Sequence, residues 1–149
     1  MSWGVFMQTP DDARSRNMRA IKGQKTKLEE SVAKALWKRG FRFRKNVKTL
    51  YGKPDLAIKK YKLVIFIDSC FWHGCPEHGK LPKNNREFWR RKLERNKERD
   101  AEVTDYYRAK GWQIKRVWEH RIKEDFEGTI NELEEFIKKA IIGSSESTD

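Results

Sequence analysis

The stretch Leu63-Val-Ile-Phe-Ile67, which runs after two further residues into Cys70-Phe-Trp-His-Gly-Cys-Pro-Glu-His78, decides the fold of this chain. Five consecutive apolar residues, rich in branched and aromatic side chains, predict a strand of a sheet. The nine residues of the second segment hold two cysteines, two histidines and two large aromatic residues. The chain therefore places a group of metal-binding side chains just beyond a strand.

Four of its cysteines and histidines have the types and spacing of a structural zinc knuckle. Cys70, Cys75 and His78 lie within one loop, and the fourth ligand that we expect is His120, at the end of another strand-like run. Structural Zn²⁺ takes four such ligands in a tetrahedron. His73 is the one histidine left outside this set, and it indicates an enzyme rather than a fold that zinc merely stabilises.

The charge balance favours a polyanionic partner. The 149 residues include 34 lysines and arginines against 22 aspartates and glutamates, a formal net charge of +12. Cations that neutralise phosphates release condensed counterions, so nucleic acid is the first expectation. We see no signal peptide, lipid anchor or apolar membrane span, and we expect a cytoplasmic protein without membrane contact. In that compartment two cysteines are metal ligands more often than a disulfide.

The length predicts one domain over residues 14–142, with a flexible N-terminus (1–13) and a disordered polar tail (143–149). The expected elements are a helix from Thr26 to Gly40 that opens on the capping box Thr26-Lys-Leu-Glu29, strands over 41–47, 55–59 and 63–67, a helix over 86–110, a strand over 112–118 and a helix over 126–141. This order predicts an α/β fold in which helices flank a mixed central sheet.

Asp55 raises the possibility of a catalytic metal site. It opens a strand directly after Pro54, and the next strand ends in Ile67-Asp68, before the loop that carries His73. Adjacent strands would bring the Asp55 carboxylate to one edge with a backbone carbonyl or a second carboxylate, and such oxygen atoms suit Mg²⁺. A Pro-Asp pair alone is often only a turn. The combination is the layout of restriction-endonuclease-like nucleases.

Two polar residues, Asn96 and Asp100, interrupt the apolar face of the long helix that Trp89, Leu93, Val103 and Tyr107 form. Their burial costs free energy unless they have hydrogen-bond partners. Asp100 is therefore either a hydrogen-bonded core residue or a group that faces an active site and pairs with a histidine or water.

With these pieces placed, the chain resembles the very-short-patch repair (Vsr) endonucleases, bacterial enzymes that nick DNA beside a T:G mismatch. The segments that carry the resemblance occur in family order over about residues 14–122: Arg14-Ser-Arg-Asn-Met-Arg-Ala-Ile21, Gly52-Lys-Pro-Asp55, Val64-Ile-Phe66, Cys70-Phe-Trp-His73, Glu87-Phe-Trp89, Asn96-Lys-Glu-Arg-Asp100, and Gly111-Trp112 through Val117-Trp-Glu119.

The resemblance implies catalytic roles for five residues. Asp55 resembles the Mg²⁺-binding aspartate of the family, with help from the main-chain carbonyl of Ile67. His73 resembles the histidine that activates the attacking water, and Asp100 would orient it. Glu29 matches an active-site glutamate, although the capping box is its alternative role.

The resemblance also implies DNA contacts. Phe71, Trp72 and Trp89 match aromatic residues that wedge into the base stack near the mismatch, where unstacking costs least. Core packing is the alternative, above all for Trp89, which lies on the apolar stripe. Contacts to DNA are also expected from four polar or basic residues, Arg14, Arg16, Arg19 and Asn96.

The chain departs from the family in two places. Asp68 stands where some relatives carry an active-site histidine, and it would be either a second Mg²⁺ ligand or a residue that holds the loop. The zinc ligands after Cys70 are arranged differently, with His120 where relatives often have a cysteine, so the set here would be Cys₂His₂.

Together these features predict a Mg²⁺-dependent endonuclease, stapled by zinc, that nicks one strand beside a T:G mismatch in very-short-patch repair. We expect a monomer in the bacterial cytoplasm, associated with the nucleoid and with mismatch-repair proteins. One alternative is a restriction- or defence-associated nuclease on the same core. Another is a zinc-stabilised DNA-binding module without activity, against which the candidates Asp55, His73 and Asp100 argue.

Overall fold

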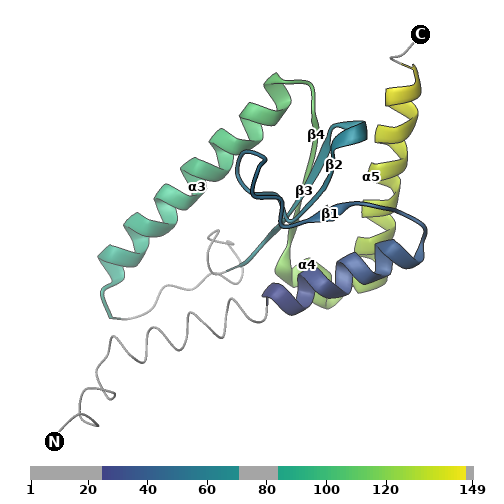
Figure 1. Ribbon diagram of the computed structural model, residues 1–149. Helices are drawn as coiled ribbons and strands as arrows, with labels where there is room; N and C mark the ends of the chain where they lie inside the picture. Colours follow the sequence, from purple (N-terminus) through teal and green to yellow (C-terminus); the bar gives the residue numbers. More distant parts are fainter. Residues whose placement is uncertain (1–24, 71–83, 147–149) are drawn as a thin grey trace, which may run out of the picture.

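The computed structural model describes residues 25–70 and 84–146 of the chain (Figure 1). Its centre is a four-stranded sheet in the order β1-β2-β3-β4, built from Arg44–Lys45, Leu56–Ile58, Leu63–Asp68 and Gln113–Trp118. Strands β1, β2 and β3 pair antiparallel, whereas β3 and β4 are parallel. The sheet is therefore mixed, as the sequence predicts.

Strand β3 is buried along its whole length because helices cover both faces of the sheet. Leu63, Ile65 and Ile67 belong to one apolar core, which also includes residues of the helix over 25–38, of α4 (Glu119–Glu124) and of α5 (Phe126–Glu146). Val64 and Phe66 belong to a second core against α3 (Arg86–Ala109). A run without polar alternation is what a strand covered on both faces requires.

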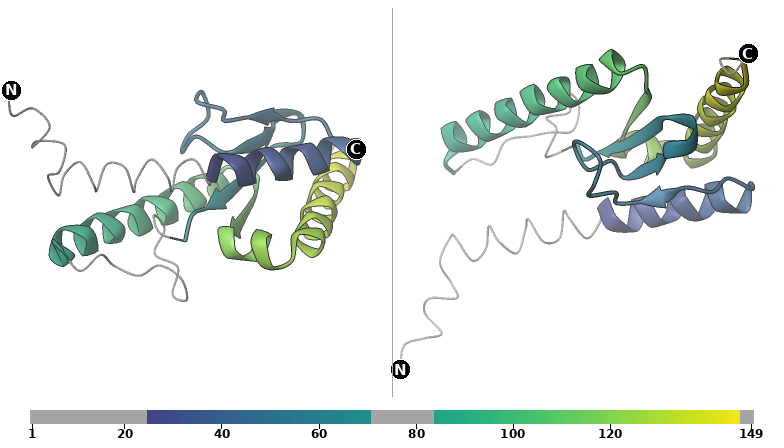
Figure 2. Two further views of the ribbon diagram at one scale, coloured as in Figure 1. Left: turned by 90° about the horizontal axis from the view of Figure 1, so that it is seen from below. Right: turned by 45° about the horizontal axis from the view of Figure 1, so that its top comes forward.

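The helices accordingly lie in two layers. In both views of Figure 2, α3 lies on one side of the sheet and α5 on the other, and the helix over 25–38 lies on the side of α5. Gly111 follows the end of α3 with a φ of 77°, a left-handed conformation that glycine adopts without strain. The predicted end of the long helix is thus confirmed.

Several predicted boundaries differ from the structure. Strand pairing over 41–47 is limited to Arg44–Lys45, because Phe41 and Phe43 pack against the core without joining the sheet. Lys25 and Thr26 are both helical, so Thr26 is not an N-cap and the predicted capping box is wrong. The short helix α4 was not expected, and α5 continues to Glu146, into the expected tail.

Candidate active site

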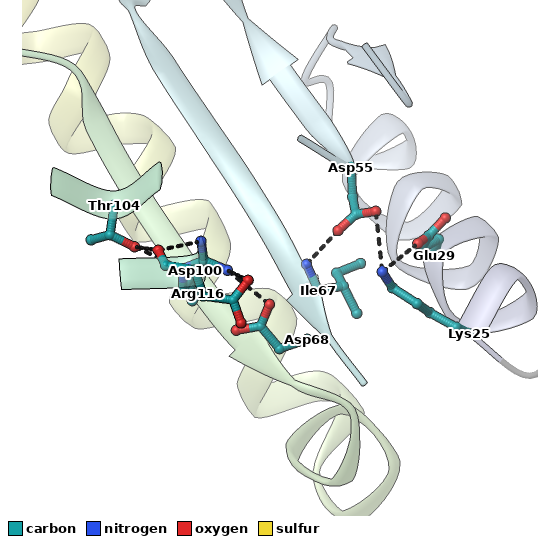
Figure 3. A network of polar contacts seen from close by, with 8 residues as sticks. All are labelled: Lys25, Glu29, Asp55, Ile67, Asp68, Asp100, Thr104 and Arg116. Carbon is teal, nitrogen blue, oxygen red and sulfur yellow. Dashed lines mark hydrogen bonds and ion pairs between the residues drawn. The ribbon is translucent and has the colours of Figure 1, made fainter. Parts of the chain in front are cut away.

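Asp55 is a buried carboxylate directly before β2, and its position is fixed from several sides. The main-chain N–H of Ile67 donates a hydrogen bond of 2.6 Å to Asp55 Oδ2, which joins the two residues across the β2–β3 pair (Figure 3). The carbonyl of Asp55 accepts a bond from the N–H of Asn46. The structure thus brings together Asp55 and Ile67, the two residues expected to share one edge of the sheet.

The loop before Asp55 is anchored to α3. The hydroxyl of Tyr107 donates to the carbonyl of Tyr51, and burial raises the pKa of Tyr107 to about 12. Gly52 has a φ of 75°, and a Cβ there would lie 2.6 Å from Cγ1 of Val103. Glycine is therefore required in Gly52-Lys-Pro-Asp55 because the backbone touches α3 directly.

Glu29 and Lys25, from the helix over 25–38, complete the group around Asp55. Lys25 Nζ lies 3.6 Å from Glu29 Oε1 and 3.8 Å from Asp55 Oδ1 (Figure 3). The side chains of Glu29 and Asp55 are 14% and 9% exposed. Burial, and then the hydrogen bond and charge of Asp55, raise the pKa of Glu29 to about 7, and Lys25 opposes this rise. We call these three residues the Lys25 cluster.

A second polar group lies on the other side of β3, around Arg116 of β4 (Figure 3). Its guanidinium donates to Asp68 Oδ1 at 2.9 Å, to Thr104 Oγ1 at 2.9 Å and to the carbonyl of Asp100 at 3.1 Å. It also lies 3.9 Å from Asp100 Oδ1 and stacks over the ring of Phe66 at 4.5 Å. We call Arg116, Asp68, Asp100 and Thr104 the Arg116 cluster.

Arg116 and Lys25 are the two basic residues of these clusters, and the sequence did not single out either of them. Asp100 interrupts an apolar helix face and therefore needs a polar partner, and Arg116 is one such partner. A basic residue inside a strand next to apolar neighbours was the available signal. Lys25 is one of 34 lysines and arginines, and nothing in its local sequence indicates that it reaches two acids.

Two of the four expected zinc ligands meet. Cys70 is buried, and its Sγ lies 3.3 Å from His120 Nδ1 although the two are 50 residues apart. The other two, Cys75 and His78, lie outside the described residues. Among the residues that the structure describes, no group of three or more potential metal ligands forms.

Of the residues expected to contact DNA, the structure describes only Trp89 and Asn96, both on α3. Trp89 is 3% exposed, whereas its neighbour Phe88 is 50% exposed, so Phe88 is the ring that solvent reaches. Asn96 is half-buried on the same helix. The remaining candidates, Arg14, Arg16, Arg19, Phe71 and Trp72, lie outside the described residues, as does His73.

Comparison with known proteins adds an independent finding. Residues 7–78 match the family model described as DNA mismatch endonuclease Vsr. The type II nicking enzyme V.NaeI of Lentzea aerocolonigenes is 41% identical over 127 residues, which cover 82% of this chain and 76% of that protein. The type II nicking enzyme V.NmeDIP of Neisseria meningitidis is 45% identical over 116 residues (76% and 78%). The DNA mismatch endonuclease Vsr of Escherichia coli is 35% identical over 137 residues (90% and 86%).

Proposed function

The chain belongs to the Vsr family of DNA endonucleases, and from this premise we propose that it nicks one strand of duplex DNA beside a T:G mismatch, with Mg²⁺ as the catalytic metal. The observation that carries the proposal is the Lys25 cluster, in which two largely buried carboxylates share one cation beside β2 and β3. The named relatives include a mismatch endonuclease and several type II nicking enzymes. Nicking linked to restriction is therefore the second candidate.

The residues present fit a divalent cation. Asp55 would hold it, with the main-chain carbonyl of Ile67 and the nearby Glu29 as further oxygen donors. The ammonium of Lys25 already stands in as a cation beside both carboxylates, at 3.6 and 3.8 Å. When bound, Mg²⁺ supplies charge neutralisation at the phosphate and helps to protonate the leaving oxygen.

The water that attacks the phosphate needs a base. We assign this role to His73, whose imidazole accepts a proton near neutral pH, and we assign to Asp100 the task of orienting that ring. The contact of Asp68 with Arg116 favours the loop-holding role for Asp68 over the role of a second Mg²⁺ ligand. His73 follows five residues after Asp68, so the Arg116 cluster would fix the strand end from which the His73 loop starts.

Contacts with the duplex would come mainly from basic side chains, which position DNA through its phosphates without reading sequence. Arg14, Arg16 and Arg19 are the candidates in the N-terminal run, and Phe71 and Trp72 are those for the wedge beside the mismatch. The exposure of Phe88 beside the buried Trp89 supports Phe88 as a further aromatic contact. Within the described residues, no helix is long and apolar enough to cross a bilayer.

The test of the function uses end-labelled duplexes, one with a T:G mismatch and one fully paired, in Mg²⁺ or EDTA. We expect a single-strand nick beside the mismatched T that requires Mg²⁺. The variant Asp55→Asn keeps an acceptor for the Ile67 N–H but loses the metal-binding charge, and it should nick about a hundredfold to a thousandfold more slowly. Equal nicking of both duplexes would instead support the second candidate, and binding without nicking would contradict both.

We also propose that Cys70, Cys75, His78 and His120 hold a structural Zn²⁺ that closes the loop carrying His73. The approach of Cys70 and His120 supports this set. Removing one ligand should therefore lower zinc content and thermal stability together, because folding and zinc binding are coupled. We expect Cys75→Ala to lose zinc, measured by atomic emission, from about one ion per chain.

The matched control for zinc is His73→Ala. It removes a histidine from the same loop, and we expect it to keep its zinc while nicking is lost. Loss of zinc in this variant would make His73 a ligand and would overturn its assignment as the base.

A further inference from the structure

We propose that Lys25 is an internal competitor of the catalytic metal: in the metal-free enzyme its ammonium occupies the position between Glu29 and Asp55 that Mg²⁺ takes on binding. This inference rests on the proposed function, because it requires Mg²⁺ to bind at Asp55. It adds a residue that sets how much Mg²⁺ the enzyme needs.

The first support is that Lys25 contacts two elements. A lysine four residues before a glutamate on a helix is a common surface pair. Lys25 goes further, because Nζ also approaches Oδ1 of Asp55, the residue directly before β2. Two carboxylates from different elements therefore converge on one ammonium group, as they would on a metal ion.

The second support is that the contacts are long. The two distances, 3.6 and 3.8 Å, exceed the 2.7–2.9 Å of a charge-assisted hydrogen bond. The Lys25 side chain is 26% exposed, so its ammonium can regain water when it leaves. A compact charge on a flexible stem is easily exchanged, unlike a guanidinium held by several bonds.

The third support is the electrostatic state of the acid pair. The side chains of Glu29 and Asp55 are 14% and 9% exposed and lie 3.6 and 3.8 Å from the same ammonium, so the two carboxylates repel when both are ionised. Lys25 reduces that repulsion in the absence of metal. A divalent ion would do so more strongly, and the two cations would repel each other if both stayed beside the same oxygens. Binding of Mg²⁺ therefore has to displace the ammonium of Lys25.

The experiment is a calorimetric titration of the full-length, zinc-containing protein with MgCl₂ in the absence of DNA. Wild type is compared with Lys25→Gln, Lys27→Gln and Asp55→Asn. Lys27 is an exposed residue of the same helix, so its replacement removes the same charge from nearly the same place. Thermal melts establish that each variant is folded.

We expect Lys25→Gln to bind Mg²⁺ about tenfold more tightly than Lys27→Gln, since a competing charge has been removed at close range. Lys25→Arg, which keeps a cation there, should bind no more tightly than wild type. Equal affinity of Lys25→Gln and Lys27→Gln, or weaker binding by Lys25→Gln, would overturn the inference while leaving the proposed function intact.

The Asp55→Asn variant separates the proposed metal site from the proposed role of Lys25. If Asp55→Asn loses Mg²⁺ binding, the metal site of the proposed function stands, and the comparison of the lysine variants decides the inference. If Asp55→Asn binds Mg²⁺ like wild type, the metal site itself is wrong, and the competitor role of Lys25 falls with it.

Discussion

The two polar clusters on either side of β3 have similar composition but different geometry (Figure 3). Each combines two acidic residues with one basic residue. In the Lys25 cluster the cation lies 3.6 and 3.8 Å from the carboxylates. In the Arg116 cluster the guanidinium makes three hydrogen bonds of 2.9 to 3.1 Å and stacks on an aromatic ring.

This difference in contact geometry indicates different roles: the Arg116 cluster is a structural frame that joins β3, β4 and α3, and the Lys25 cluster is a site where one cation can replace another. Arginine presents its donors in a planar fork, which can join a strand end to a helix backbone as Arg116 joins Asp68 to Asp100. Lysine offers a single charge without such a fork, and Lys25 contacts Glu29 and Asp55 only at 3.6 and 3.8 Å, so another cation can replace it. One cluster thus holds its elements in place, and the other can change its occupant.

The largest effect on the free energy of unfolding should follow from replacing Arg116, the centre of the Arg116 cluster. Replacing Arg116 by methionine keeps much of the packing over Phe66 but leaves the carboxylate of Asp68, which is buried, without this partner. Removing one partner of a fully buried pair costs about 3–5 kcal/mol, and the 21% exposure of the Arg116 side chain lowers this cost. We expect Arg116→Met to lower the free energy of unfolding by about 2–3 kcal/mol, and Lys25→Met by less than about 1 kcal/mol, both measured by urea denaturation.

The control for this comparison is Arg121→Met. Arg121 forms a short contact of 3.0 Å with Glu132, but its side chain is 53% exposed. An exposed pair contributes at most about 1 kcal/mol whatever its length. If Arg116→Met costs no more than Arg121→Met, the Arg116 cluster is not the frame that we describe. Asp68→Asn combined with Arg116→Met should recover part of the loss, because no charge then remains buried at residue 68.

Much of the sheet could be predicted because its strands are short apolar runs between turn residues. Strands β3 and β4 and helix α3 follow the expected bounds to within one or two residues. The expected strand over 41–47 was too long, because alternation alone does not distinguish sheet pairing from apolar packing at Phe41 and Phe43. The contacts of Phe41 and Phe43 with the core decide where sheet pairing begins.

The acidic members of both clusters could be found from the sequence, whereas their basic partners could not. Asp55 follows a proline before a strand, and Asp100 interrupts an apolar face; both are local signals. Arg116 meets Asp100 and Asp68 only because 16 and 48 residues of chain fold back between them. The place of Arg116 inside a strand is a local signal, but in a chain with 34 lysines and arginines only the fold decides which acid a basic residue meets.

A smaller effect should distinguish the Lys25 cluster by its pH dependence. The pKa of Glu29 is raised to about 7 in the folded protein, from 4.5 for an exposed glutamate. Between these values the folded state keeps a proton that the unfolded state has released, so rising pH lowers the stability of the metal-free protein. Glu29→Gln, which does not titrate, should be about as stable as wild type at pH 5 and about 1–2 kcal/mol more stable at pH 8.

Urea denaturation of the two proteins without Mg²⁺ measures this difference, and Glu30→Gln is the control. Glu30 is exposed on the same helix, so its replacement changes net charge equally without touching Asp55. The difference in free energy of unfolding between Glu29→Gln and Glu30→Gln should therefore grow with pH. Saturating Mg²⁺ should remove this difference, because a cation beside Glu29 favours its ionised form. A pH-independent difference would mean that Glu29 is ionised throughout, held by Lys25 as firmly as Asp68 is held by Arg116. The two clusters would then be alike, and the contrast between frame and exchangeable site would fail.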